Sequence, residues 1–228
     1  MTETLIKAVS SDSLEKTLRL TEMFYSLQGE TNTLGLPTVF IRLTGCPLRC
    51  SYCDTEYAFY GGKIHSFEAV LEELKKYPTQ YITVTGGEPL AQPNCRDLLA
   101  LLCDLGFKVS LETSGAMSIA DLDDRVSVVL DLKTPASNES EKNLYENIPL
   151  LQKNDQVKFV ICDRNDYEWA KEQVKTLALS GKVADVWFSP IHGELSATDL
   201  ADWIIADGLQ VRFQLQLHKL LWADEPGR

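Results

Sequence analysis

The stretch that decides the fold is "VFIRLTGCPLRCSYCDT", residues 39–55, in which an apolar run passes directly into a loop with three cysteines. The run is β-branched and short, which favours a buried strand. The loop that follows places reactive side chains at the carboxyl end of that strand. The same order, an apolar run followed by a short polar or glycine-rich sequence motif (here called a word), recurs along the chain.

Short apolar runs alternate with longer segments that have helical periodicity, a pattern typical of parallel strands joined by helices. The runs predicted as strands are 38–43, 81–87, 107–115, 126–133, 157–161, 185–190 and 211–216. The segments predicted as helices are 66–77, 94–106, 166–179 and 198–208, and the polar start of 134–156 predicts a loop before a further helix.

The number of these units limits the fold class. No internal repeat, low-complexity tract or linker interrupts them, so they predict one α/β domain with a continuous sheet. Six or seven units are too few for a closed eight-stranded barrel. We therefore expect a partial, open (βα) barrel of about six parallel strands, with functional residues on the loops at the carboxyl ends of the strands.

Charge and hydropathy exclude several classes of protein. The 228 residues include 22 Lys and Arg against 33 Asp and Glu, a net charge of −11, which suits neither a nucleic-acid backbone nor an anionic membrane surface. The chain shows no signal-peptide pattern and no apolar stretch of roughly 18 residues. These features predict a cytoplasmic protein, in which cysteines stay reduced and are available as ligands.

Five polar words follow five of the predicted strands. Because the carboxyl ends of parallel strands lie at one edge of a sheet, we expect these words to converge on one site. The words are "GCPLRC" (45–50), "TGGEP" (85–89), "ETSG" (112–115), "DLKTP" (131–135) and "SPIHG" (189–193).

Cys46, Cys50 and Cys53 have the spacing C-x3-C-x2-C, which lets one loop direct three thiolates at a metal centre. A zinc site would need a fourth nearby ligand, and His65 stands alone twelve residues further on. A redox pair would use only Cys50 and Cys53. An iron–sulfur cluster held by three thiolates keeps one iron open, whereas electron-transfer clusters normally have four cysteine ligands. The remaining cysteines, Cys95, Cys103 and Cys162, are expected to be small core residues.

With Tyr52 as the aromatic residue before the third cysteine, this spacing resembles the radical S-adenosylmethionine (SAM) superfamily. The resemblance implies a [4Fe–4S] cluster on Cys46, Cys50 and Cys53, with SAM bound to the open iron. It also implies SAM contacts from the cysteine loop and from the four later words. The residues implied are Tyr52, Cys53, Asp54, Gly86, Gly87, Glu88, Thr113, Ser114, Asp131, Leu132, Lys133, Ser189, Pro190, Ile191 and His192.

Each of these words also has a simpler structural interpretation. "TGGEP" could be a strand-ending turn in which Glu88 supports the backbone. "ETSG" could cap a following helix through Thr113 or Ser114. Lys133 could be a surface lysine, and His192 alone indicates little. Their common position after predicted strands favours the site.

Four further words resemble the 7-carboxy-7-deazaguanine synthase family: "FYSLQGE" (24–30), "FIRLTGC" (40–46), "CDT" (53–55) and "QLQLHKLLW" (214–222). The resemblance covers most of 22–222, which makes 22–228 a single radical SAM domain and 1–21 an N-terminal extension. It implies conversion of 6-carboxy-5,6,7,8-tetrahydropterin to 7-carboxy-7-deazaguanine with loss of ammonia. It further implies magnesium, a homodimer and an external reductant such as flavodoxin.

The same resemblance implies a set of substrate residues. Leu27, Gln28, Gly29 and Glu30 would hold the pterin edge, Thr85 would face the substrate, and the Thr55 hydroxyl would bind Mg²⁺. Arg42 would pair with the substrate carboxylate, because its planar fork matches two oxygens. A structural salt bridge is the alternative for Arg42, since a charge within an apolar strand requires a partner.

The chain departs from the family pattern at two places. It has "QGET" where many relatives have "QGEG", and "DLK" where many have "SPK", which puts Asp131 in place of a serine. "DLK" also occurs in glycyl-radical enzyme activating enzymes, an alternative function that would not need "QGE", "CDT" or "HKLLW". A non-catalytic metal-binding or electron-transfer module is the alternative of another class, and it predicts a fourth cluster ligand.

Overall fold

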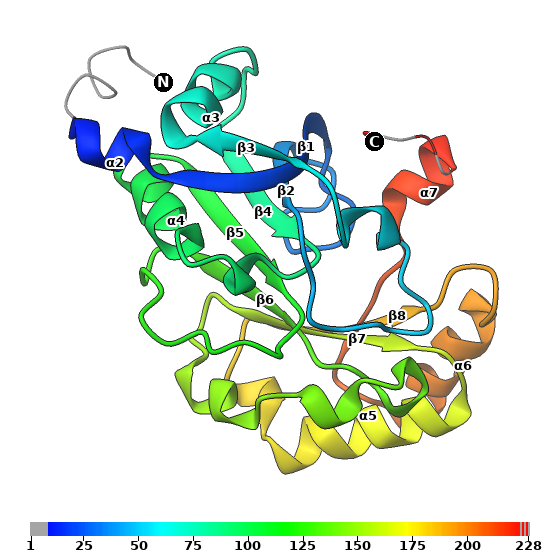
Figure 1. Cartoon of the computed structure of the whole chain (residues 1–228). Coiled ribbons are helices and arrows are strands. Elements are labelled where there is room, and N and C mark those ends of the chain that lie inside the picture. The colour runs from blue at the N-terminus through cyan, green and yellow to red at the C-terminus, as the bar shows by residue number, and fades with distance from the viewer. Residues whose placement is uncertain (1–8, 224, 226, 228) are drawn as a thin grey trace.

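A computed structural model describes residues 9–223, 225 and 227. Within these residues nine strands form one sheet in the order β3-β1-β2-β4-β5-β6-β7-β8-β9 (Figure 1). The strands are β1 (Thr17–Leu27), β2 (Pro37–Leu43), β3 (Lys63–Ser66), β4 (Tyr81–Gly86), β5 (Lys108–Thr113), β6 (Ser127–Asp131), β7 (Gln156–Ile161), β8 (Asp185–Pro190) and β9 (Arg212–Phe213).

The sheet is mostly parallel and open. Each pair from β2–β4 to β8–β9 is parallel, while β1 pairs antiparallel with both β2 and β3. The order is linear, with β3 and β9 at its two edges. This confirms a partial open barrel, and all seven predicted runs appear as its parallel strands, although β9 keeps only two residues.

Helices cover the outer side of the sheet (Figure 1). All four predicted helices are present, as α3 (Phe67–Leu74), α4 (Cys95–Asp104), α5 (Arg164–Thr176) and α6 (Ala197–Asp207). Of these, α4, α5 and α6 follow the parallel strands β4, β7 and β8, and α3 follows β3. Three of them begin at side-chain caps, where Ser66, Asp163 and Ser196 accept from the amide three residues on. The short helices α2 (Ser11–Glu15) and α7 (Leu217–Trp222) lie near the two ends of the chain.

The expected helix within 134–156 is wrong. The segment forms three short 3₁₀ turns, η3 (Pro135–Ser137), η4 (Ser140–Lys142) and η5 (Tyr145–Leu150). Pro149 lies inside the last turn, and proline removes an amide that a continuing helix requires. The buried Asn147 side chain also draws this turn against the loop after β5, by binding the carbonyls of Gly115 and Met117.

The N-terminal segment joins the sheet earlier than residue 22. Strand β1 begins at Thr17, and Leu18 and Leu20 are buried in the core. The expected boundary between residues 21 and 22 therefore falls inside β1, while residues 1–8 of the expected extension lie outside the described residues.

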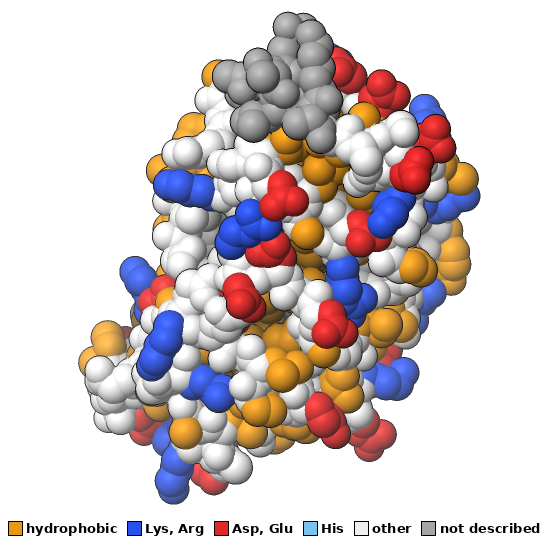
Figure 2. All heavy atoms as spheres, turned by 90° about the vertical axis from the view of Figure 1, so that its left-hand side faces the viewer, with side chains coloured by type: hydrophobic (Ala, Val, Ile, Leu, Met, Phe, Trp, Pro, Cys, Tyr) orange, Lys and Arg blue, Asp and Glu red, His pale blue; other side chains and the backbone are white. Residues whose placement is uncertain are grey.

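Over the part of the chain that the structure describes, no helix has the length and apolar character needed to cross a bilayer. Figure 2 shows the face that carries α2 and α4, where acidic and basic side chains are interspersed. Several of them are ion pairs, including Lys16–Asp97 at 2.7 Å. Basic side chains form no stripe on this visible face.

Candidate active site

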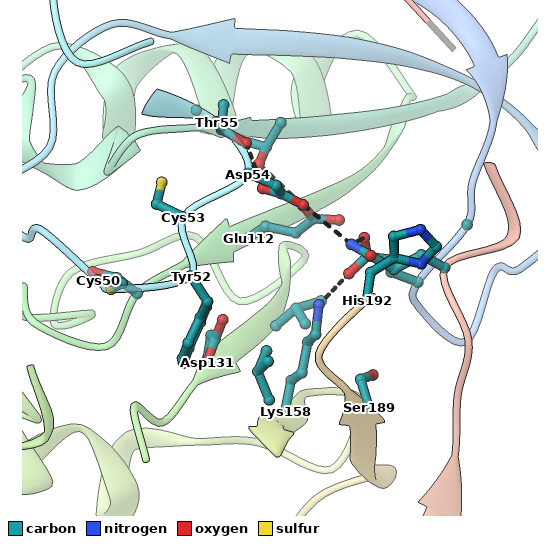
Figure 3. A pocket seen from close by; sticks show the side chains of 18 of the residues that line it. Cys50, Tyr52, Cys53, Asp54, Thr55, Glu112, Asp131, Lys158, Ser189 and His192 are labelled. Carbon is teal, nitrogen blue, oxygen red and sulfur yellow. Dashed lines mark hydrogen bonds and ion pairs between the residues drawn. The ribbon is translucent and has the colours of Figure 1, made fainter. Parts of the chain in front are cut away.

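A cavity of about 490 Å³ opens at the carboxyl ends of the parallel strands and continues into the barrel interior (Figure 3). All five polar words contribute to its wall, together with the turn after β1. The predicted residues that line it are Leu27, Gln28, Gly29, Glu30, Arg42, Cys46, Cys50, Tyr52, Cys53, Asp54, Thr55, Thr85, Gly86, Gly87, Thr113, Ser114, Asp131, Lys133, Ser189, Pro190, Ile191 and His192.

Two predicted cofactor residues do not line this cavity. The Glu88 side chain is fully buried and accepts hydrogen bonds from Thr113 Oγ1 at 2.9 Å, from Ser114 N at 2.8 Å and from Leu90 N at 2.9 Å. It is therefore a buttress that ties the β4 turn to the β5 end. Leu132 is also fully buried and belongs to the hydrophobic core, because alternation along the chain turns it away from Asp131 and Lys133.

The two glycines of "TGGEP" are required by the protein's own backbone. A Cβ on Gly86, whose φ is +151°, would lie 2.2 Å from the carbonyl oxygen of Leu43. A Cβ on Gly87 would lie 2.3 Å from the carbonyl oxygen of Gly45. The β4 turn thus packs directly against the start of the cysteine loop, which explains the glycines by close backbone approach.

The cysteine loop is held by the segment after β6. Ser51 N donates to Ser137 O at 3.1 Å, and Ser51 Oγ donates to Ala136 O at 2.7 Å. Burial raises the pKa of the Cys46 and Cys53 thiols, and it raises the pKa of Cys50 to about 11. Free thiols at this site are neutral, so loading a metal centre would release protons.

The donor set fits a cluster on three thiolates. Among the described residues no group of three or more His, Cys, Asp or Glu side chains could hold a single metal ion, yet Cys46, Cys50 and Cys53 all line one cavity. Beside them, Asp131 Oδ1 is a buried acceptor without a hydrogen-bond partner in the described residues. A hydroxyl donor from a nucleoside would satisfy this oxygen.

Lys133 accompanies Asp131 at this end of the cavity. Its Nζ lies 2.8 Å from Asp131 Oδ2 and 5.9 Å from the centre of the Tyr52 ring. Burial would lower the pKa of Lys133, but Asp131, Tyr52 and Cys50 together outweigh this effect and raise it. Lys133 is therefore a fixed cation beside the cysteine loop, and the alternative of a surface lysine is wrong because only 9% of the residue is exposed.

Arg42 is both a cavity residue and half of a salt bridge. Its Nε donates to Glu22 Oε1 at 2.7 Å, and its guanidinium lies 5.6 Å from the centre of the Phe24 ring. This is its one hydrogen bond within the described residues, so the two Nη groups keep their donors available. The structure thus joins the two alternatives, because Glu22 orients a guanidinium that still faces the cavity.

Gln28 organises the deep end of the cavity. Its Oε1 accepts from the amides of Gly29 at 2.8 Å and Glu30 at 3.0 Å, which shapes the turn after β1. Its Nε2 donates to Thr83 Oγ1 at 3.0 Å and to Glu112 Oε1 at 3.3 Å. Gln28 is thus largely occupied in holding the turn, and the backbone of the turn is presented to the cavity.

Sequence reasoning missed two charged residues inside the barrel, Glu112 and Lys158. Glu112 is the first residue of "ETSG", and its Oε2 accepts from Thr85 Oγ1 at 3.0 Å. Burial, aided by the negative charge of Glu30, raises the pKa of Glu112. Lys158 pairs with Glu30. The available signal was a charge inside an apolar run, "VKFVI", which requires a partner as the charge of Arg42 does.

The C-terminal segment also contributes residues that lie in the family motif "QLQLHKLLW" but were given no individual role from the sequence. Gln216 Nε2 donates to Glu30 Oε1 at 2.8 Å and to Asp54 Oδ2 at 3.2 Å, so it links the turn after β1 to the cysteine loop. His218 lies against Gly29, where an added Cβ would be 2.8 Å from His218 Nδ1. The start of α7 therefore closes one side of the cavity.

Comparison with known proteins agrees with this geometry. A family model described as "Radical SAM superfamily" matches residues 40–187, and the chain belongs to that superfamily. Proteins named 7-carboxy-7-deazaguanine synthase from Koribacter versatilis and Chlorobaculum tepidum are 40% and 38% identical over 224 and 213 residues. The matches cover 91% and 92% of this chain and 98% and 96% of those proteins. Within the superfamily, the chain therefore belongs to the 7-carboxy-7-deazaguanine synthase family, and membership implies a [4Fe–4S] cluster and SAM.

Solved structures support the fold. The crystal structure of QueE from Escherichia coli matches with a TM-score of 0.73 at 24% identity, covering 88% of this chain and 94% of that one. Streptococcus suis SuiB bound to S-adenosylmethionine matches with a TM-score of 0.52 at 16% identity, covering 75% of this chain and 45% of that one. None of these findings supports an activating enzyme or a non-catalytic module.

Proposed function

We propose that this chain converts 6-carboxy-5,6,7,8-tetrahydropterin to 7-carboxy-7-deazaguanine with loss of ammonia, a step towards queuosine and related 7-deazapurines. The shared name of its relatives supports this reaction. The observation that carries it is the cavity itself, which has the three thiols of the cysteine loop on one wall and Arg42, Thr85 and the turn after β1 on another.

The cysteine-loop wall suits a cluster and a nucleoside cofactor. When bound, the cluster and SAM would supply one-electron reductive cleavage and a radical that abstracts hydrogen from the substrate. Cys46, Cys50 and Cys53 would hold the cluster. Asp131 Oδ1 would accept from a ribose hydroxyl, and Lys133, whose Nζ pairs with Asp131 Oδ2, would offer a cation to a carboxylate.

The opposite wall orients the substrate. Arg42 would bind the 6-carboxylate with its Nη groups while Glu22 holds Nε. Thr85, whose hydroxyl donates to Glu112, would contact the ring. The backbone of Leu27 and Gly29 would supply donors and acceptors to the pterin edge. Fixing both ends of the substrate would orient its reacting carbon, and such positioning can supply a large part of a rate enhancement.

Thr55 would contribute the single protein ligand to a magnesium ion. Its hydroxyl lines the cavity and donates to Asp54 Oδ1 at 2.8 Å, so it would turn from that carboxylate when an ion binds. Mg²⁺ prefers oxygen ligands and often keeps few from the protein. Substrate oxygens and water would complete the shell.

The setting of the enzyme is part of the same proposal. A cytoplasmic location is supported by the need of three cysteines to stay reduced, and a reductant such as flavodoxin would supply the electron. A homodimer is supported by Leu220 and Leu221 on α7, which are 64% and 52% exposed and leave apolar surface next to the cavity.

The test is mass spectrometry of anaerobically reconstituted protein with SAM, reductant, Mg²⁺ and 6-carboxytetrahydropterin. We expect 7-carboxy-7-deazaguanine, and release of ammonia in equal amount. Cleavage of SAM to 5′-deoxyadenosine without that product would refute the substrate assignment and favour an activating enzyme. Cluster-loaded protein that cleaves no SAM would refute the reaction class.

A further inference from the structure

Lys158 is a cation inside the barrel that core packing does not explain. It lies in the middle of β7, whose neighbouring residues Val157 and Phe159 are fully buried on the helix side. Because side chains alternate along a strand, Lys158 faces the cavity (Figure 3). Its side chain is only 13% exposed. An ammonium at such depth is costly unless it has partners.

Its protein partner is Glu30, which comes from the turn after β1. Lys158 Nζ pairs with Glu30 Oε2, while Glu30 Oε1 accepts from Gln216 Nε2 at 2.8 Å. Burial would raise the pKa of Glu30, but Lys158 outweighs it and lowers the value. In the same way Glu30 raises the pKa of Lys158 against the effect of burial. Both groups are charged at neutral pH.

This pair keeps unused hydrogen-bonding capacity. An ammonium has three donors, and Lys158 Nζ uses one of them within the described residues. A carboxylate has about four lone-pair positions, and Glu30 receives two hydrogen bonds. Buried donors without partners are unfavourable. Since both residues line the cavity, a bound ligand can supply these partners in place of water.

We propose that Lys158 determines substrate specificity: its ammonium donates to the 4-oxo oxygen of a 2-amino-4-oxopyrimidine ring, while Glu30 accepts from the N–H groups beside that oxygen. This inference rests on the proposed function. The pair then matches the alternating acceptor and donors of that ring edge. A 4-amino group would bring one donor against another, and sites built to hydrogen-bond a group strongly reject analogues that lack it.

The competing explanation is that Lys158 only neutralises the charge of Glu30. The two explanations differ in what happens to selectivity, because charge compensation gives no preference between a 4-oxo and a 4-amino ring. Lys158→Gln separates them, since its amide can face either group. Lys153→Gln is the matched control, because Lys153 donates to the Gly181 carbonyl and lies outside this cavity.

The experiment compares 6-carboxypterin with 2,4-diaminopteridine-6-carboxylate as inhibitors of 6-carboxytetrahydropterin turnover by the cluster-loaded enzyme. We expect the unchanged enzyme and Lys153→Gln to prefer the 4-oxo inhibitor by at least about tenfold, as for a hydrogen bond to a charged group. In Lys158→Gln the preference should fall to about threefold or less, with a KM for the substrate raised at least about tenfold and kcat changed little.

The inference is overturned if the unchanged enzyme shows no preference between the two inhibitors, or if the preference survives in Lys158→Gln. In either case, formation of product leaves the proposed function intact. Failure of the unchanged enzyme to form product refutes the proposed function instead. Iron content and thermal unfolding show whether Lys158→Gln folds. Lys158→Arg, which keeps a cationic donor, should retain the 4-oxo preference, and its loss there would also count against the assignment.

Discussion

The two walls of the cavity are encoded in different ways. We call the cysteine-loop wall the cofactor wall, and the opposite wall, with Arg42, Thr85 and the turn after β1, the substrate wall. Each predicted contact on the cofactor wall belongs to a short continuous word, such as the eleven residues of "GCPLRCSYCDT". On the substrate wall, side chains come together from distant positions, as when Lys158 on β7 pairs with Glu30 in the turn after β1. The cofactor wall therefore depends on the backbone of single loops, whereas the substrate wall depends on the closure of the whole sheet. Substitutions on the two walls should therefore have different effects on the enzyme.

The largest effect is expected on the cofactor wall. Cys50→Ala removes one of three thiolates, and we expect loss of the cluster, of SAM cleavage and of product below detection. Iron analysis and visible absorption of anaerobic protein measure the first, and 5′-deoxyadenosine measures the second. Cys103→Ala is the control, because Cys103 is buried in α4 outside the cavity. A cluster that survives in Cys50→Ala would contradict the ligand assignment.

The next largest effect is expected on the substrate wall. Arg42→Lys keeps the charge but loses the planar fork, so kcat/KM for the pterin should fall about 100-fold, or about 2.7 kcal/mol of transition-state stabilisation. SAM cleavage without substrate should remain. Steady-state kinetics with both readouts tests this. Equal loss of the two activities would show that Arg42 supports the cofactor wall and would remove the distinction between the walls.

A smaller effect is expected where one buried group braces the cofactor wall. Glu88→Gln replaces an acceptor of several hydrogen bonds with an amide that must also donate, so the free energy of unfolding should fall by about 2 kcal/mol. Urea unfolding measures the loss. Glu68→Gln on the exposed face of α3 should change the same quantity by less than about 0.5 kcal/mol. Similar values for the two variants would mean that Glu88 is no buttress.

The smallest effect concerns the pH dependence of stability. The folded-state pKa of Glu112 is raised above its usual 4.5 by burial first and then by Glu30. The folded protein thus binds more protons than the unfolded chain, and the contribution of Glu112 is lost as pH rises through the folded-state pKa. Glu112→Gln should therefore flatten the decline of unfolding free energy above about pH 4.5.

Urea unfolding at several pH values, with Glu112→Gln beside the unchanged protein, measures this difference. Gln can accept from Gln28 with its oxygen and donate its amide to the Thr85 hydroxyl, in place of the two hydrogen bonds that Glu112 accepts, so packing should be preserved. Parallel curves of unfolding free energy against pH would refute the raised pKa of Glu112. A steeper decline in the variant would mean that the pKa of Glu112 is lowered on folding.

Most of the fold was predictable because strand patterning is local. Seven apolar runs became seven parallel strands, and four helical patterns became helices. Predictions failed where distant contacts decide local structure. The turn at Tyr145–Leu150 is shaped by Asn147 binding the loop after β5, and β1 takes in residues 17–21 because Leu18 and Leu20 find the core. In both cases the residues in contact are far apart in the sequence.

The site was predictable to a similar extent. The spacing of Cys46, Cys50 and Cys53 together with the superfamily resemblance predicted a cluster, and the three residues line one cavity because one loop determines where they lie. Glu88 was placed on the correct turn, and its buried side chain takes the alternative role of supporting the backbone rather than lining the cavity. Lys158 was overlooked because the role of a lysine in an apolar strand can be assigned only when its partner is known.

By itself the sequence determined the order of strands and helices, the position of the polar words after the strands, and the grouping of three cysteines in one loop. These properties follow from hydrophobic periodicity and from spacing within one loop. The tertiary structure decided which side chains face the cavity, which charges meet and what closes its side. Those features depend on sheet curvature and on contacts such as Lys158–Glu30, which join residues that only folding brings together.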